Sequence, residues 1–331
     1  MAKTSKSRRV KEAWPRKRQV LSRDDRFKSR LMIGPLRDLM MTANMKKRYE
    51  ASLCRYFAFA ELNAFVEPSD DVDLDGSVAK YIDHLWEEGD PRYWGEDTLS
   101  GFSKYIPSLR GTFKLSWSLV TAWQRNEPPQ RCAPLSLDIL LAMVGFATHK
   151  GWDNFALLVV LGFHCILRTA EMYNLRIADM EFNASGTKGV LTLKEFKSGT
   201  HYNIVESVTI TDRGVIRLAK AIMGGKDRGS LIFPDGPYHF RRCFDQIVLG
   251  LSLPSAMLYK PYSIRRGAAT ADFMSHGKLS RTCVRGRWAN EKTCRIYVNE
   301  SSAALSAIRC SAKSLGLVHE YKSLAIQTLA V

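Results

Sequence analysis

The segment Asn126–Leu135, NEPPQRCAPL, constrains the fold more than any other stretch of this 331-residue sequence. Proline lacks the backbone N–H that a helix interior needs, so the paired Pro128 and Pro129 interrupt any helix that reaches them. The stretches on both sides have helical periodicity, and the chain is long enough for two domains of ordinary size. The sequence therefore predicts two domains joined by a linker over residues 126–135.

Residues 34–125 are expected to form a small all-helical domain. Between Pro35 and Phe65 apolar residues recur at helical spacing with basic residues between them, which predicts a long helix. After an acidic loop, SVAKYIDHLWEEG predicts a second helix with Ser77 as its N-cap and Gly89 as its stop. Two further helical stretches, EDTLSGFSKYI and FKLSWSLVTAWQR, bring the total to about four helices.

Residues 136–331 are expected to form a larger domain with a small sheet. Ser136 is a plausible cap for the apolar helix LDILLAMVGFATHKG, and the very apolar NFALLVVLGFHCIL follows it. Between Gly189 and Ile210, VLTLKEF and NIVESVTI are rich in β-branched residues and flank the turn-like KSGTHY, which predicts a hairpin with Lys197 at its tip. Helical stretches then resume, so the predicted fold class is mainly α with a small β-sheet.

The charge distribution points to an anionic partner. The formal net charge is +16, and residues 1–30 alone hold twelve Lys or Arg and three acids, which gives +9. Nucleic acid is the commonest partner for such a basic protein. Residues 1–33 are therefore interpreted as a basic flexible arm that serves nuclear import or contacts phosphates, or else as a solubilising tail.

Other classes of protein receive no support from the sequence. No apolar stretch reaches the roughly eighteen residues of a membrane span, and the N-terminus lacks the apolar region of a signal peptide, so we expect an intracellular protein without a membrane partner. The seven cysteines are scattered and never spaced as CxxC, and the histidines form no HxxxH or HExxH motif. We therefore expect no disulfide framework, no metal and no cofactor.

Two arginines are candidates for a chemical role. Arg168 follows an apolar helix and lies three residues before Glu171, so it either pairs with that carboxylate or presents its guanidinium to a phosphate. Arg265 lies in PYSIRRGAATADF, where a run of small residues predicts a tightly packed helix start. Its neighbour Arg266 must face another direction, because adjacent helical residues do not share a face.

Three further residues are weak signals individually. Lys197 at a hairpin tip is typical of a solvated turn, Trp288 of a core residue, and Tyr297 of a packing aromatic. Their order is the stronger observation. An arginine, a hairpin lysine, a Tyr-x-x-Arg, and a tryptophan nine residues before a tyrosine follow one another in a basic chain whose front half is helical.

In this order the residues resemble the tyrosine recombinase, or phage-integrase, family. The family pattern is an arginine with an acid three residues later, a lysine in a β-hairpin, a His-x-x-Arg, a His or Trp, and a tyrosine nucleophile. The corresponding residues here are Arg168 with Glu171, Lys197, Tyr262 with Arg265, Trp288, and Tyr297. The stretch NMKKRYEASLCRYFAFAEL resembles the first helix of the family's core-binding (SAM-like) domain. IRRGAAT and GRW are most similar to recombinases of eukaryotic mobile elements.

The resemblance implies a site-specific recombinase that cuts and rejoins DNA through a 3′-phosphotyrosine, without metal or ATP. Tyr297 would be the nucleophile, and Arg168 and Arg265 would stabilise the charge on the attacked phosphate. Lys197, or else Lys194, would protonate the leaving 5′-oxygen. Trp288 would pack or hydrogen-bond against the phosphate, and Glu171 would brace the arginines from behind.

One position departs from the family pattern. The histidine that precedes the second arginine by three residues is Tyr262 here, and a phenol is a poor general base near neutral pH. Two alternatives therefore stay open beside the recombinase: a domesticated DNA-binding protein that has lost cleavage, and strand relaxation like that of a type IB topoisomerase.

The family resemblance also implies partners. Double-stranded DNA would be the substrate, and four protomers would act on two sites during integration, excision or transposition of a mobile element. The tail ESSAALSAIRCSAKSLGL could dock on a neighbouring protomer or pack on its own domain. The nucleus is the expected location in a eukaryote, and the cytoplasm with the nucleoid otherwise. Candidate DNA contacts are Lys46, Lys47, Arg48, Arg266 and Arg287.

Overall fold

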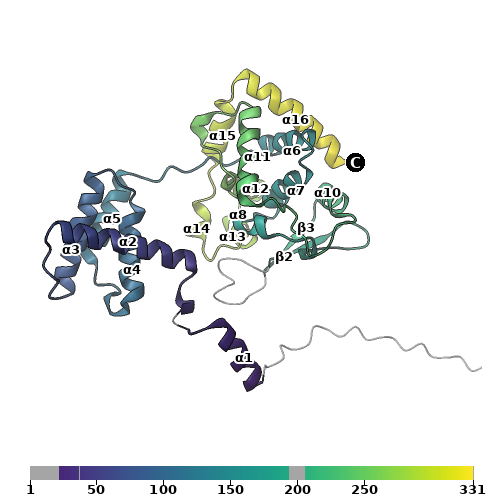
Figure 1. Ribbon diagram of the computed structural model, residues 1–331. Helices are drawn as coiled ribbons and strands as arrows, with labels where there is room; N and C mark the ends of the chain where they lie inside the picture. Colours follow the sequence, from purple (N-terminus) through teal and green to yellow (C-terminus); the bar gives the residue numbers. More distant parts are fainter. Residues whose placement is uncertain (1–21, 37, 194–205, 331) are drawn as a thin grey trace, which may run out of the picture. The chain divides into compact units, whose positions relative to one another are not determined.

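The computed structural model describes residues 22–36, 38–193 and 206–330. The chain divides into two compact units, Met1–Pro129 and Gln130–Val331, and the division falls inside the proline-containing segment 126–135. Figure 1 shows the elements of both units. The predicted Lys197 and its alternative Lys194 lie outside the described residues.

The first unit is helical. Its principal helices are α2 (Ala43–Leu62), α3 (Asp71–Glu87), α4 (Tyr93–Tyr105) and α5 (Lys114–Asn126), with two 3-10 turns, η1 (Asp38–Met40) and η2 (Pro107–Leu109). Helix α2 packs on α4, and α3 packs on α5. Aromatic rings fill the space between them: Tyr56 meets Tyr81 and Phe102 edge-on at centroid distances of 5.6 and 5.3 Å. These ring contacts add specific geometry to the apolar burial.

The start of α3 differs from the sequence prediction. The helix begins after Asp70, whose carboxylate accepts hydrogen bonds from the amides of Val72 and Asp73, both at 2.9 Å. The predicted cap Ser77 lies inside the helix, and its hydroxyl hydrogen-bonds the Tyr56 hydroxyl at 2.7 Å. Aspartate is as good an N-cap as serine, and the "acidic loop" therefore supplies the cap and first turn. Gly89 follows the helix end with φ of +76°, as expected for a stop.

Part of the predicted flexible arm is a helix. Residues Arg23–Ile33 form α1, which corrects the interpretation of residues 1–33 as uniformly flexible. The side chain of Ser22 accepts the amide of Asp25 at 3.1 Å, acidic residues occupy the first turn, and Arg30 lies in the last turn. The charges thus complement the helix dipole at both ends, which the count of basic residues alone conceals.

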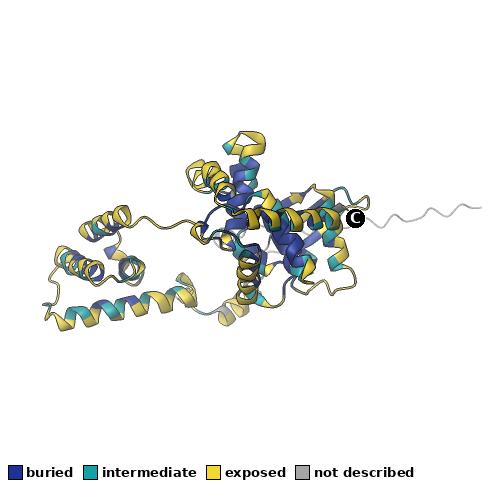
Figure 2. Ribbon diagram, turned by 90° about the horizontal axis from the view of Figure 1, so that it is seen from above, coloured by how far each residue is buried: buried dark blue, intermediate teal, exposed yellow. Residues whose placement is uncertain are grey.

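The second unit is built around two apolar helices, α6 (Leu137–His149) and α7 (Asp153–His164). Residues 155–162 of α7 are all buried, so this helix is covered on every side. Ser136 caps α6 as predicted, accepting the amide of Ile139 at 3.3 Å. Figure 2 shows the buried residues gathered in the middle of this unit. None of the helices within the described residues has the length and apolarity to cross a membrane.

Further helices cover this centre. They are α8 (Thr169–Asn174), α10 (Arg213–Met223), α11 (Gly236–Gly250), α12 (Tyr262–His276), α13 (Leu279–Arg285), α14 (Glu291–Arg295), α15 (Glu300–Ile308) and α16 (Ala312–Ala330), with 3-10 turns η3 (Ile177–Asp179) and η4 (Ser255–Met257). Helix α12 packs directly on α7. The start of α12 is where the predicted catalytic arginine lies, so the buried core of the unit supports it.

The described residues contain one three-stranded antiparallel sheet, β1 (Met180–Phe182), β2 (Gly189–Leu193) and β3 (Glu206–Ile210), in the order β1-β2-β3. Leu191 is paired with both Met180 and Val208, and these apolar side chains are buried on one face. The predicted pairing of the two β-branched segments is confirmed. The predicted fold class, mainly α with a small sheet, is also confirmed.

The C-terminal helix packs on its own chain. Helix α16 lies along α6, where the ring of Tyr321 packs against Phe146 at a centroid distance of 4.9 Å and Lys322 pairs with Asp138 at 2.6 Å. Gly145 permits this approach, because a β-carbon there would lie 1.9 Å from the carbonyl oxygen of Tyr321. The two helices can meet so closely only with glycine at this position.

We therefore expect Gly145→Ala to destabilise the second unit. The added methyl group forces α16 away from α6, and overpacking of this kind typically costs about 1–3 kcal/mol. Gly316→Ala is the matched control on α16, where a β-carbon meets nothing within 4 Å. It should keep or raise the thermal unfolding midpoint, because alanine favours helix over glycine. Equal midpoints for the two variants would contradict this account of the contact.

Candidate active site

A buried carboxylate joins two arginines at the start of α8. Arg168 precedes the helix, and Glu171 accepts its backbone amide at 2.7 Å and its guanidinium at 2.5 Å. Arg287 donates to the second oxygen of the same carboxylate at 2.6 Å. The side chain of Glu171 is 1 % exposed, whereas that of Arg168 is 24 % exposed. The sequence alternatives for Arg168 thus coexist: it pairs with Glu171 and still reaches solvent, where an anion can approach it.

Arg265 lies beneath this pair at the start of α12. It is 1 % exposed, and its guanidinium donates to the carbonyl oxygens of Ile166 and, at 2.8 Å, of Gly286. Burial, followed by the charges of Arg168 and Arg287, lowers the pKa of Arg265 to about 10. The group stays cationic at neutral pH, but its surroundings favour the arrival of an anion.

Tyr297 lies over the same guanidinium. The Arg265 guanidinium carbon is 4.4 Å from the centroid of the Trp288 ring and 5.4 Å from that of Tyr297. The ring of Tyr297 is 4.7 Å from Trp288 and 5.7 Å from Tyr262, centroid to centroid. The structure therefore brings together Arg168, Tyr262, Arg265, Trp288 and Tyr297, which come from segments far apart in the sequence.

The electrostatic surroundings distinguish the two tyrosines. Burial raises the pKa of Tyr297, but interaction with the Tyr262 hydroxyl and the charge of Arg265 outweigh it, so the pKa of Tyr297 falls below 10. Burial and the interaction with Tyr297 raise the pKa of Tyr262. Tyr297 is thus the phenol that ionises more readily, and Tyr262 stays protonated as a donor.

Two short segments place Tyr297. Asn290 caps α14 by accepting the amide of Thr293 at 2.8 Å, and the Tyr297 amide then bonds the Cys294 carbonyl at 2.9 Å. On the other side, Thr270 of α12 accepts the amide of Asn299 at 3.1 Å through its hydroxyl. The tyrosine is therefore held on one side by the turn that ends α14 and on the other side, through Thr270, by the helix that carries Arg265.

Trp288 has an unused donor. The residue is 9 % exposed, and its indole Nε1 lies near enough to the Tyr297 hydroxyl to help lower the pKa of Tyr297, without a well-formed hydrogen bond among the described residues. An indole N–H that is buried normally finds an acceptor. Its position over Arg265 and beside Tyr297 leaves it available to an oxygen atom that enters the cluster.

The base of the hairpin is connected to this cluster. Glu206 begins β3, and its carboxylate lies 3.0 Å from Nε of Arg287. Arg287 therefore links the hairpin, whose tip is predicted to carry Lys197, with Glu171 and Arg168. Arg287 also adopts a left-handed backbone conformation with φ of +58°, which is uncommon for a residue with a side chain and is sustained here by its ion pairs.

The candidate DNA contacts are distributed over both units. Lys46, Lys47 and Arg48 lie on α2 of the first unit, where Arg48 forms a two-pronged ion pair with Asp97 at 2.7 Å. In the second unit Arg287 is held by carboxylates, as described above, and Arg266 is buried. The sequence indicated no role for Arg287 as a bridge between carboxylates. Only the fold brings Glu171 and Glu206 to it.

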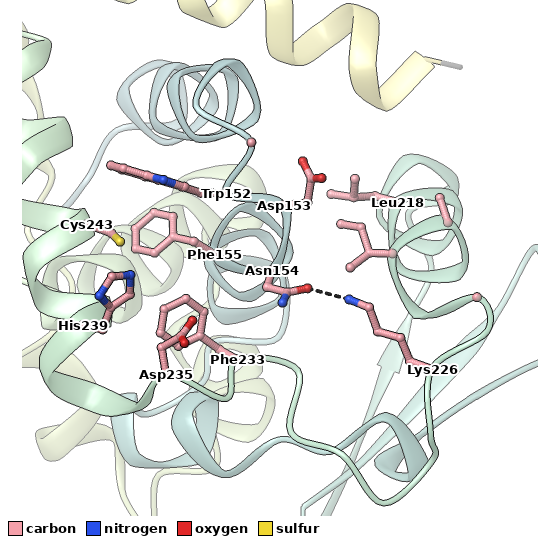
Figure 3. A pocket seen from close by; sticks show the side chains of 14 residues that line it. Trp152, Asp153, Asn154, Phe155, Leu218, Lys226, Phe233, Asp235, His239 and Cys243 are labelled. Carbon is pink, nitrogen blue, oxygen red and sulfur yellow. Dashed lines mark hydrogen bonds between the residues drawn. The ribbon is translucent and has the colours of Figure 1, made fainter.

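Metal ligands are not gathered in the described part of the chain: no group of three or more His, Cys, Asp or Glu side chains there could hold a metal ion. A separate cavity of about 700 Å³ is lined by rings that include Trp152, Phe155 and Phe233 (Figure 3). Lys226 donates to the Asn154 side-chain oxygen at its edge at 2.8 Å. No residue of the predicted site lines this cavity, so it is separate from the cluster formed by Arg168, Tyr262, Arg265, Trp288 and Tyr297.

Comparisons with solved structures show the fold. The Tn1549 transposon integrase, in complex with transposon right-end DNA, is 12% identical with a TM-score of 0.56, covering 81% of this chain and 93% of that one. A lambda integrase dimer bound to a COC′ core site is 13% identical with a TM-score of 0.53, covering 84% and 94%. The predicted resemblance to tyrosine recombinases is confirmed at the level of the fold. No family model and no curated protein matches the sequence.

Proposed function

We propose that this protein breaks and rejoins duplex DNA by covalent catalysis, with Tyr297 as the nucleophile. The observation that carries the proposal is the placement of the Tyr297 ring against Arg265 and Trp288, with its pKa lowered by Tyr262 and Arg265. A phenol becomes a useful nucleophile only where its anion is stabilised. The fold shared with two DNA-bound integrases supports DNA as the substrate.

The first step forms one bond and breaks one. Tyr297 first loses its proton to solvent. Its phenolate oxygen then attacks the phosphorus of a phosphodiester, the bond from phosphorus to the 5′-oxygen breaks, and Lys197 gives that oxygen a proton. The products are a 3′-phosphotyrosine and a free 5′-hydroxyl. In the second step a 5′-hydroxyl attacks the phosphotyrosine, restores the diester and releases Tyr297. Each step exchanges one phosphodiester bond for another, so no ATP is required.

The cluster stabilises the charge that this attack builds up. Negative charge would develop on the non-bridging phosphate oxygens. The guanidinium of Arg265 is fixed beside Tyr297, and that of Arg168 is held by Glu171 near enough to Arg265 to influence its pKa. The free indole N–H of Trp288 supplies a further donor. Glu171 and Arg287 hold Arg168 in place. Fixed donors of this kind need no reorganisation at the moment of reaction.

The wider role follows from this chemistry. We propose that the protein acts on specific sites for integration or excision of a mobile element, with four protomers on two DNA sites. In a eukaryotic cell, the basic segment 1–33 would direct the protein to the nucleus. The two units would bind duplex DNA with phosphate contacts supplying most of the affinity.

A covalent-trapping assay tests the proposal. The protein is mixed, in the presence of a chelator, with duplexes from the flanks of the encoding element. Each duplex is nicked next to the scissile bond, so that the short fragment with the free 5′-hydroxyl diffuses away after cleavage. We expect an adduct that resists SDS. DNA binding without any adduct would favour the domesticated DNA-binding protein, and relaxation of plasmids that lack these sites would favour a topoisomerase.

The pH dependence of adduct formation reports on Tyr262. The rate should rise with pH as Tyr297 ionises, with its inflection at lower pH than for an ordinary tyrosine, because the pKa of Tyr297 is lowered. Tyr262→Phe removes a hydroxyl that stabilises the Tyr297 anion, so the inflection should move to higher pH. At neutral pH the rate should therefore fall, because a smaller fraction of Tyr297 is ionised there. A single-turnover profile that Tyr262→Phe leaves unchanged would contradict this role.

A further inference from the structure

The second unit contains a polar cavity that the catalytic cluster does not use. It has a volume of about 480 Å³ and is lined by Arg131, Arg266 and Arg295, together with the start of α15 from Glu300 to Ser302. Arg131 follows the division between the units, and Arg295 lies two residues before Tyr297. Three guanidiniums therefore meet one carboxylate, that of Glu300, in a space large enough for a phosphate group.

Arg266 is the informative residue. It is 4 % exposed, and its Nε atom is buried without a hydrogen-bond partner among the described residues. No ion pair of Arg266 occurs there either. Burying a guanidinium without a partner is costly, because the group loses its water and gains nothing in return. The cavity beside Arg266 leaves room for a partner supplied from outside the chain.

The start of α15 adds a second attraction for an anion. Asn299 caps this nine-residue helix by accepting the amide of Ser302 at 2.9 Å. The first amides of a helix carry a partial positive charge and point outward from its N-terminus. Arg131 and Arg295 are exposed at the same cavity, so an anion can enter from solvent and reach Arg266 behind them.

Arg265 and Arg266 are consecutive on α12, but their side chains lie in different surroundings. Arg265 donates to Ile166 and Gly286 beneath Tyr297, whereas Arg266 lines the cavity. Neighbours on a helix lie about 100° apart around its axis, which explains the division. Arg295 and Asn299, each two residues from Tyr297 in the chain, line the same cavity, so its ligand lies against the segment that carries Tyr297.

We propose that this cavity binds a second phosphate of the DNA strand that Tyr297 attacks, one close in the strand to the scissile phosphate. The inference rests on the proposed function, which supplies the strand. Successive phosphates recur about every 3.4 Å along the axis of one strand, so a chain held at one phosphate necessarily presents others nearby. The cavity would fix the register of the strand, and Arg266 would position it without touching the reacting atoms.

Salt-dependent DNA binding by the full chain tests this. Affinity for a duplex of about 40 base pairs is measured over a range of salt concentrations for the wild type and for Arg266→Gln. Each phosphate contact contributes about 0.9 to the slope of log K against log salt, so Arg266→Gln should lower the slope by about 1 and the affinity by about tenfold. Arg266→Lys keeps the charge and should keep the slope.

Two controls make the result specific. Arg213→Gln removes an exposed arginine of α10 that does not line the cavity, and its slope should match that of the wild type. If circular dichroism shows that Arg266→Gln fails to fold, the exposed Arg295→Gln replaces it, with the same expected loss. Covalent trapping with the wild type tests the proposed function separately, so failure of this inference is distinguishable from failure of the proposed function.

A second readout uses inorganic phosphate. Sodium phosphate, compared with sodium chloride at equal ionic strength, should raise the unfolding midpoint of the wild type and not of Arg266→Gln. If Arg266→Gln loses the stabilisation by phosphate but binds DNA with the same salt dependence as the wild type, the assignment to DNA would be overturned. A free phosphate or an acidic peptide would then be indicated as the ligand. An unchanged slope and an unchanged phosphate response would show that the cavity binds no anion.

Discussion

Replacing Tyr297 by phenylalanine is expected to abolish the covalent protein–DNA adduct. The substitution removes one oxygen atom and keeps the ring that packs against Trp288 at 4.7 Å and lies over Arg265. The fold and the DNA affinity should therefore stay close to those of the wild type. No other tyrosine of the described residues lies as close to Arg265 and Trp288 together, so no substitute nucleophile is at hand.

The matched comparison for this prediction is Tyr262→Phe. It removes the hydroxyl of the neighbouring ring, whose centroid lies 5.7 Å from that of Tyr297. Adduct formation should become slower but should not be eliminated. The two variants thus separate a nucleophile from a group that only tunes it. An adduct that forms with Tyr297→Phe at the wild-type rate would exclude Tyr297 as the attacking residue.

Arg265→Lys is expected to lower the rate of adduct formation by about 10²- to 10³-fold. The Arg265 guanidinium uses two of its nitrogens to hold the carbonyls of Ile166 and Gly286. A lysine offers one ammonium group, which cannot hold these carbonyls and face a phosphate in the same way. Loss of one preorganised donor to a developing oxyanion typically has an effect of this size. Single-turnover kinetics with saturating protein measure it directly.

Arg285→Lys is the control for that substitution. Arg285 is also an arginine of the second unit with protein partners, donating to Asp272 at 2.5 Å and to the carbonyl of His164 at 2.8 Å. It does not contact Tyr297, Arg265 or Trp288, so its replacement should change stability more than the rate. If the two variants slowed adduct formation equally, the special role of Arg265 would be wrong.

The sequence predicts the parts of the fold that depend on local chemistry. The segment with Pro128 and Pro129, the Ser136 cap and the β-branched hairpin strands all follow from properties of nearby residues. The error at α3 arose because two good caps, Asp70 and Ser77, compete, and the hydroxyl of Ser77 is used by Tyr56 instead. Helix α1 was not predicted because its many charged residues indicated a flexible arm, although those charges complement the helix dipole.

The candidate site depends more on contacts between distant segments. The resemblance to tyrosine recombinases implied that Arg168, Arg265, Trp288 and Tyr297 share one site, and the structure brings these side chains together. The bridging role of Arg287 could not be predicted, because its partner Glu206 begins a strand far away in the sequence. The burial of Arg266 was likewise invisible, since a pair of consecutive arginines usually indicates a solvated surface.

Mass spectrometry of the trapped adduct tests the central claim most directly. Trypsin releases Tyr297 in the peptide Ile296–Arg309 and Tyr262 in the peptide Cys243–Arg265, so the two tyrosines are separated. We predict that the DNA remnant is attached to Ile296–Arg309 through a 3′-phosphate on Tyr297. A remnant on the peptide that contains Tyr262, or on any other peptide, would contradict the assignment of Tyr297 as the nucleophile.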